Sequence, residues 1–107
     1  MPIDKITSLI GFAVRSGKVI LGYDRIIENR SKKYLIITAN EINITAKKRL
    51  IKYAQENVVP ILQTNMDLSK ITGITKCKAL AFSDKQMAQA ALKNINDNYQ
   101  LIILEEN

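Results

Sequence analysis

Hydrophobic positions along the chain follow two different periods. From Ile6 to Ala13 apolar side chains recur at helical spacing, which predicts a helix with one apolar face, and Asp4 can cap its start. Residues 34–38 show no alternation and are rich in β-branched and aromatic side chains. A strand covered on both faces has this pattern, so the chain is expected to contain a buried sheet.

The two periods alternate along the whole chain. Helices, with their possible caps, are predicted over residues 4–16, 23–29, 43–57, 65–72 and 83–95. Strands are predicted over residues 19–21, 34–38, 58–63 and 77–82, with 101–104 as a final strand or a packed tail. Pro60 lacks a donor for the strand ladder, which favours an edge strand or the start of a strand. This alternation predicts a single domain over residues 1–107, built as an α/β fold: a three-layer α/β/α sandwich with a small mixed sheet.

Composition agrees with an ordered domain that has a basic surface. The 107 residues are 47% hydrophobic and 24% charged, which is typical of a globular protein and argues against disorder. Formal net charge is +6 and the pI is about 9.6, as in many nucleic-acid binders, although basic surfaces also serve solubility. The N-terminus lacks a secretory signal pattern and no apolar run approaches a membrane span, so a reducing cytoplasm is the expected location.

Residues for catalysis or metal binding are scarce. Histidine is absent, which removes the commonest general base and the commonest metal ligand. Cys77 is the single cysteine, and in an apolar strand it is expected to be a core residue rather than a reactive thiol. No Walker-type loop or nucleophile elbow occurs. We therefore expect no enzymatic activity, no cofactor and no metal.

Basic residues concentrate between Gly17 and Thr38, around the glycine that opens the second predicted helix. A helix start between cationic side chains can bind phosphate, because its free N–H groups and dipole favour anions. Four residues of this stretch are candidates for holding phosphates: Lys18, Arg30, Lys32 and Lys33. RNA is therefore the expected partner.

Two loops are candidates for reading RNA, and both are expected at one end of the sheet. The first opens the second helix with Gly22, Tyr23, Asp24 and Arg25, and the second is Ile74-Thr75-Lys76. Guanidinium and carboxylate groups can read base edges, and an apolar loop residue can cover a splayed base. Tyr23 and Tyr34 are candidates for stacking.

The order of several segments resembles the L-seven-Ae/L-thirty-e ribosomal protein family, and most closely its small bacterial YlxQ-like members. The segments are IGFAVRSGKVILGYDRI, KKYLIITANEINITAKKRL, NVVPIL, LSKITGI and KALAFSD. The likeness covers roughly residues 5–95. It implies an α/β/α sandwich that binds structured RNA, notably kink-turns, in a ribosomal or ribonucleoprotein setting, without catalysis or cofactor.

The RNA signature of that family opens the second helix as Gly-x-Asn-Glu-x-x-Lys. Gly22 matches it, whereas Asp24 replaces the asparagine and so lacks its amide donors. Arg25 replaces the acidic residue and Glu28 replaces the lysine, so both charges are inverted. The resemblance implies that Gly22 and Asp24 approach the RNA and that Arg25 reads or clamps it. Ile74 and Lys76 would then cover it.

The sequence also leaves two other functions open. One is a protein-interaction module on the same fold, without kink-turn specificity, which would dock to a ribosome or RNA-processing factor. It would use the Glu105-Glu106 tail or the basic helix face from Lys47 to Lys52. The other is a recognition domain like those attached to RNA 2′-O-methyltransferases, which resemble this fold but carry a catalytic domain as well.

Overall fold

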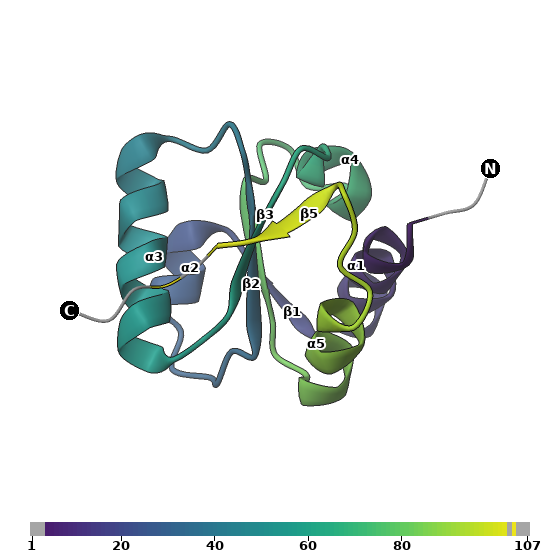
Figure 1. Ribbon diagram of the computed structural model, residues 1–107, viewed down its shortest axis with the longest axis horizontal. Coiled ribbons are helices and arrows are strands. Elements are labelled where there is room, and N and C mark those ends of the chain that lie inside the picture. The colour runs from purple at the N-terminus through teal and green to yellow at the C-terminus, as the bar shows by residue number, and fades with distance from the viewer. Residues whose placement is uncertain (1–3, 103, 105–107) are drawn as a thin grey trace.

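A computed structural model describes residues 4–102 and 104 as alternating helices and strands (Figure 1). The helices are α1 (Lys5–Ser16), α2 (Tyr23–Glu28), α3 (Ile44–Asn57), α4 (Leu68–Thr72) and α5 (Lys85–Leu92). The strands are β1 (Val19–Leu21), β2 (Leu35–Ala39), β3 (Ile61–Thr64), β4 (Ala79–Phe82) and β5 (Tyr99–Leu101). Glu105 and Glu106 of the expected acidic tail lie outside the described residues.

The sheet lies between two layers of helices. Its strand order is β1-β4-β2-β3-β5, with β2 and β3 parallel and the other neighbours antiparallel. Helices α1, α4 and α5 cover one face, and α2 and α3 cover the other (Figure 1). Along β2, Leu35 and Ile37 belong to the first core and Ile36 to the second, as the two-residue period of a strand requires. The expected three-layer α/β/α sandwich with a mixed sheet is confirmed.

Helix starts are fixed by the polar residues that the sequence indicated. Asp4 accepts hydrogen bonds from the backbone N–H groups of Ile6 and Thr7, at 2.9 and 3.2 Å. Asn43, Asp67 and Asp84 cap α3, α4 and α5 in the same way. Each side chain satisfies N–H groups that have no partner within the helix, so the predicted starts are confirmed.

Several predicted boundaries are wrong by two or three residues, including the start of β4 at Ala79 rather than at residue 77. Helix α5 ends at Leu92 rather than near 95, and Ile95 is 42% exposed. Strand β3 begins at Ile61 rather than at residue 58, and it has neighbours on both sides. Of the two positions expected for Pro60, the start of a strand is confirmed and the edge strand is wrong. Strand β5 begins at Tyr99, two residues before the expected start, and residue 103 of the expected strand lies outside the described residues.

The sheet has two ends that carry different groups. We call the end where β1 finishes and α2 begins the Gly22 end; β2 and β3 also finish there, and β4 begins there. The other, where β2 begins, is the Tyr34 end. A strand rises about 3.3 Å per residue, so the length of β2 separates the two ends by about 15 Å.

Candidate nucleic-acid interface

The loop at Gly22 is attached directly to the start of β4. Leu21 pairs with Leu80, and the Gly22 N–H donates a hydrogen bond of 2.9 Å to the Ala79 carbonyl. Since residues 74–76 come shortly before β4, the two candidate loops lie at the same end of the sheet, as expected. Gly22 has φ +92°, which side chains rarely tolerate, and apart from its own chain neighbours no atom lies within 4 Å of where its Cβ would stand.

Helix α2 presents its first turn between core and solvent. Ile26 is fully buried and Tyr23 packs partly against the same core, whereas Asp24 and Arg25 are exposed. Gly22 supplies no side-chain cap. A helix of six residues aligns few peptide dipoles, so binding here depends on the side chains more than on the helix start itself.

The second loop holds an apolar side chain in solvent. Gly73 ends α4 in the left-handed conformation, and the Ile74 N–H donates to Thr72 Oγ1 at 3.1 Å. On the other side, the Cys77 N–H donates to the Ile74 carbonyl at 3.2 Å, and Lys76 has φ +62°. These bonds form a turn in which Ile74 is 45% exposed. Ile74 is therefore placed where an apolar side chain can cover a base, with Thr75 and Lys76 exposed beside it.

An ion pair that the sequence did not indicate lies at the same end. Lys78 Nζ is 3.1 Å from Glu41 Oε1, and the Lys78 carbonyl accepts a hydrogen bond from the Ala39 N–H. Glu41 follows β2 and Lys78 precedes β4, so only the pairing of these two strands brings them together. Their spacing of 37 positions in the chain gave no signal.

The four candidate phosphate ligands lie at the Tyr34 end instead. Lys18 precedes β1 and forms an ion pair with Asp84 at 3.6 Å, and Arg30 and Lys32 are exposed in the segment before β2. Glu28, on the last turn of α2, is exposed between the two ends. The predicted set therefore divides into two groups, because α2 begins at one end of the sheet and the segment after it leads to the other.

Lys33 does not suit the phosphate contact that we expected of it. It is 3% exposed, its Nζ donates a hydrogen bond to the Asn29 carbonyl, and it lies 5.3 Å from the centre of the Tyr53 ring. Asn29 follows the last turn of α2, where carbonyl groups lack helical partners. In this position the Lys33 ammonium closes the C-terminus of α2.

Other residues show structural roles. Cys77 is buried, and its Sγ lies 3.5 Å from the Ala79 carbonyl, so the expectation of a core residue is confirmed. Among the described residues, no group of three or more His, Cys, Asp or Glu side chains could hold a metal ion. None of the helices in the described ranges has the length and apolar character needed to cross a membrane.

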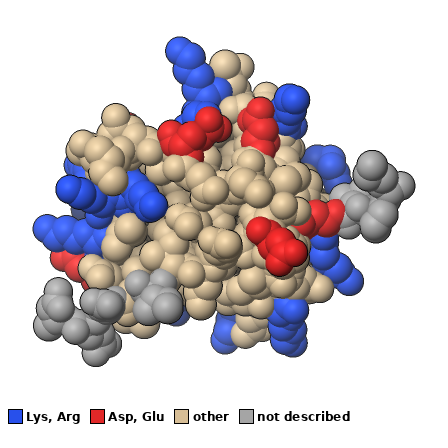
Figure 2. Space-filling model, turned by 45° about the horizontal axis from the view of Figure 1, so that its top comes forward, with Lys and Arg blue, Asp and Glu red and all other residues tan. Residues whose placement is uncertain are grey.

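On the face that Figure 2 shows, Lys and Arg lie along the margins rather than in one stripe, and most densely on the side of the α2 and α3 layer. Asp and Glu side chains lie farther in on the same face. The distribution of charge therefore does not identify the binding surface by itself. The choice of the Gly22 end depends on the geometry of its two loops.

Comparison with known proteins supports the fold. The solved structure of a protein with unknown function from Bacillus halodurans C superposes with a TM-score of 0.78 at 18% sequence identity. The match covers 85% of this chain and 96% of that chain. No curated protein matches the chain.

The family comparison covers most of the sequence. The sequence model described as the ribosomal protein L7Ae/L30e/S12e/Gadd45 family matches residues 4–94, which span α1 to the end of α5. Both loops of the Gly22 end fall within that range. The chain belongs to the ribosomal protein L7Ae/L30e/S12e/Gadd45 family.

Proposed function

We propose that this chain is a non-catalytic RNA-binding protein that holds kinked or bulged structured RNA at the Gly22 end, in a ribosomal or ribonucleoprotein setting. Family membership supports a ribosomal-protein-like role in RNA binding. The observation that carries the proposal is the bond from Gly22 to Ala79, which ties the start of α2 to the start of β4, at the end of the sheet where the loop of Ile74 leads into β4.

Each group at this end has a chemical part in the proposed complex. Gly22 leaves its backbone open to close approach, since it has no side chain and nothing fills the space where one would stand. Arg25 supplies donors in a planar fork and Asp24 supplies acceptors for base edges. Ile74 covers a base that has left the stack. Lys76, two residues further along the same loop, binds the phosphate next to that base.

A titration with three RNAs tests the proposal. Fluorescence anisotropy would compare a kink-turn duplex, a duplex with a simple bulge and a fully paired duplex of the same length. The kinked or bulged RNA is expected to bind more tightly than the paired duplex, because only unstacked bases can reach Ile74 and Arg25. Absence of binding to all three at low salt would refute the proposal.

Variants locate the interface. Arg25→Ala is expected to weaken binding to the preferred RNA by about tenfold, as loss of a charged base contact does. Arg49→Ala is the matched control, because Arg49 is an exposed arginine on α3 outside both loops. Equal losses in the two variants would mean that binding follows net charge and not the Gly22 end.

A further inference from the structure

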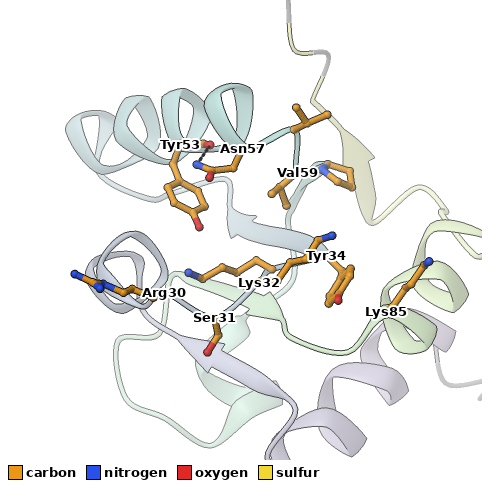
Figure 3. Close-up of a pocket in the computed structure, with 11 residues that line it drawn as sticks. Arg30, Ser31, Lys32, Tyr34, Tyr53, Asn57, Val59 and Lys85 are labelled. Atoms are coloured by element: carbon orange, nitrogen blue, oxygen red, sulfur yellow. Dashed lines mark hydrogen bonds between the residues drawn. The ribbon is translucent and has the colours of Figure 1, made fainter.

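A hollow lies at the Tyr34 end, outside the proposed interface. It has a volume of about 580 Å³ and opens between the segment of residues 30–34, the end of α3 with residues 57–60, and Lys85 on α5 (Figure 3). Hollows of this size accept ligands as large as a nucleotide. The residues that line the hollow lie within the range matched by the family model, but the match gives none of them a role in binding.

Charge in the hollow has one sign. Its lining includes Arg30, Lys32, Lys33 and Lys85, and no aspartate or glutamate. In Figure 3, Arg30 and Lys85 lie on opposite sides with Lys32 between them, so the cations are spread across the opening. An extended polyanion meets such a series of charges better than a single small anion does.

Lys33 adds a charge that the fold leaves uncompensated. Within the described ranges the ion pairs join Lys18 to Asp84 and Lys78 to Glu41, and neither reaches Lys33. Its ammonium has the Asn29 carbonyl and the Tyr53 ring as neighbours, which are polar or polarisable groups without a full negative charge. Lys33 therefore adds positive potential to the wall of the hollow, while its ammonium stays bonded to the Asn29 carbonyl and leaves contact with a ligand to the exposed cations.

Two tyrosines line the same hollow, and they differ in how they can meet a ligand. The Lys32 ammonium lies 5.3 Å from the centre of the Tyr34 ring, and the Lys33 ammonium lies 5.3 Å from that of Tyr53. Lys33 is buried and fixed, whereas Lys32 is exposed and can leave its ring for a phosphate. The face of Tyr34 that Lys32 then vacates is open to a flat base.

We propose that this hollow binds a single strand of nucleic acid. One base stacks on Tyr34, and the phosphates on either side of it are met by Arg30, Lys32 and Lys85. RNA and DNA strands share this chemistry, and the two are separated in the test below. The site does not depend on RNA binding at the Gly22 end, which is the opposite end of the sheet.

Direct titration tests this proposal. Fluorescence anisotropy would measure the binding of two fluorescein-labelled strands, octauridylate and the matching thymidine octamer, to the full chain. Uridine monophosphate and an octaglutamate peptide would serve as unlabelled competitors. Both octamers, or the RNA alone, are expected to bind at low salt and to be displaced only weakly by the mononucleotide or the peptide. Displacement by the peptide at equal concentration would overturn the proposal, and so would displacement by the mononucleotide, because neither offers a strand.

Variants in the hollow give the second readout. Lys32→Ala and Tyr34→Leu are each expected to weaken octamer binding by about tenfold, as loss of a stacking or phosphate group does, while Tyr34→Phe keeps the ring and stays within about twofold. The double variant Arg30→Ala, Lys85→Ala is expected to reduce the slope of log K against log salt by about 1.4, since each phosphate contact on a single strand contributes about 0.7.

Two controls keep the outcome readable. Lys52→Ala removes one exposed lysine from α3 outside the hollow, and Arg25→Ala disables the Gly22 end, so neither is expected to change octamer binding by more than about twofold. Lys32→Ala is expected to fold like the original chain, because the Lys32 side chain is exposed. Circular dichroism checks this. Octamer affinity equal to that of the original chain in both Lys32→Ala and Tyr34→Leu would refute the site, whatever is found at the Gly22 end.

Discussion

Asp24 is the residue whose chemistry most limits which base edges the Gly22 end could read in the proposed complex. A carboxylate offers acceptors and no donors, whereas the asparagine of the signature that this chain resembles offers both. The Asp24 side chain is exposed, so exchanging it for an amide changes the ligand surface without disturbing the core. In the proposed complex, base reading at this end therefore depends on Arg25 for side-chain donors.

Asp24→Asn is expected to raise the preference for a kink-turn duplex over a paired duplex by about five- to tenfold, because one added hydrogen bond contributes about 1 kcal/mol. Parallel anisotropy titrations of both RNAs measure this ratio. Glu56→Gln removes the same charge from an exposed site on α3 and serves as the control. A similar ratio in both variants would show that the gain comes from net charge.

Lys33 illustrates a residue whose role the sequence could not reveal. Its place in a basic run suggested phosphate binding, but its stem is buried and its ammonium bonds to the carbonyl after α2. Lys33→Ala is expected to lower the free energy of unfolding by about 1–2 kcal/mol through lost packing and one lost hydrogen bond, as measured by urea denaturation.

The neighbouring lysine provides the comparison for that measurement. Lys32 is exposed, so Lys32→Ala is expected to leave the urea midpoint nearly unchanged. The two residues adjoin in sequence and carry the same charge, which isolates burial as the variable. Equal midpoints in the two variants would contradict the assigned role of Lys33.

At the scale of elements, local signals predicted helix starts better than strand ends. A capping side chain acts on N–H groups two or three residues away, so Asp4 and Asn43 could be recognised from the sequence alone. The end of α3 at Asn57 was predicted as well, although the Val58 that follows takes a left-handed conformation with φ 54° that its side chain disfavours. Strand β5 depends on contacts with residues far away in the chain, which local patterns do not contain.

Tyr99 anchors that last strand and makes its stability depend on pH. The side chain is fully buried, and its hydroxyl lies 2.7 Å from Thr7 Oγ1, joining β5 to α1. Burial is the largest effect and raises the pKa of Tyr99 above its ordinary value of 10.0. The unfolded chain therefore loses this proton at a lower pH than the folded chain does.

The sign of the effect follows from linkage. The contribution of Tyr99 to stability is fully present below pH 10 and is lost as pH rises through the raised folded pKa. Tyr99→Phe is expected to be less stable by about 1 kcal/mol at pH 7, from the lost hydrogen bond, and to lose less stability between pH 10 and 11. Urea denaturation of both proteins at the two pH values measures this. A parallel loss in both would exclude ionisation of Tyr99 as the cause.

For the whole molecule, the sequence predicted the layers and the two loops but not the division of the cations. Apolar runs and glycine positions specify which segments are buried and where the chain turns, and these signals are local. The end of the sheet at which Lys18 and Arg30 lie depends on strand order, because β4 lies antiparallel between β1 and β2 and so makes both strands begin at the same end. A basic cluster that looks continuous in sequence is therefore divided between the two ends of the sheet.

This division leads to a prediction that joins both proposals. The two sites are about 15 Å apart along the strands, so one RNA that carries a kinked helix and a single-stranded tail can occupy both only if the tail spans that distance. Such an RNA is expected to bind at least tenfold more tightly than the helix without a tail, because the second contact becomes intramolecular.

A tail of about two nucleotides should give no gain in affinity, and a tail of about ten nucleotides should give the full gain. Lys32→Ala should abolish the gain from the long tail while leaving the affinity for the helix alone unchanged. If instead affinity rises steadily with tail length and Lys32→Ala has no effect, then the tail acts through general charge, and the hollow is not its binding site.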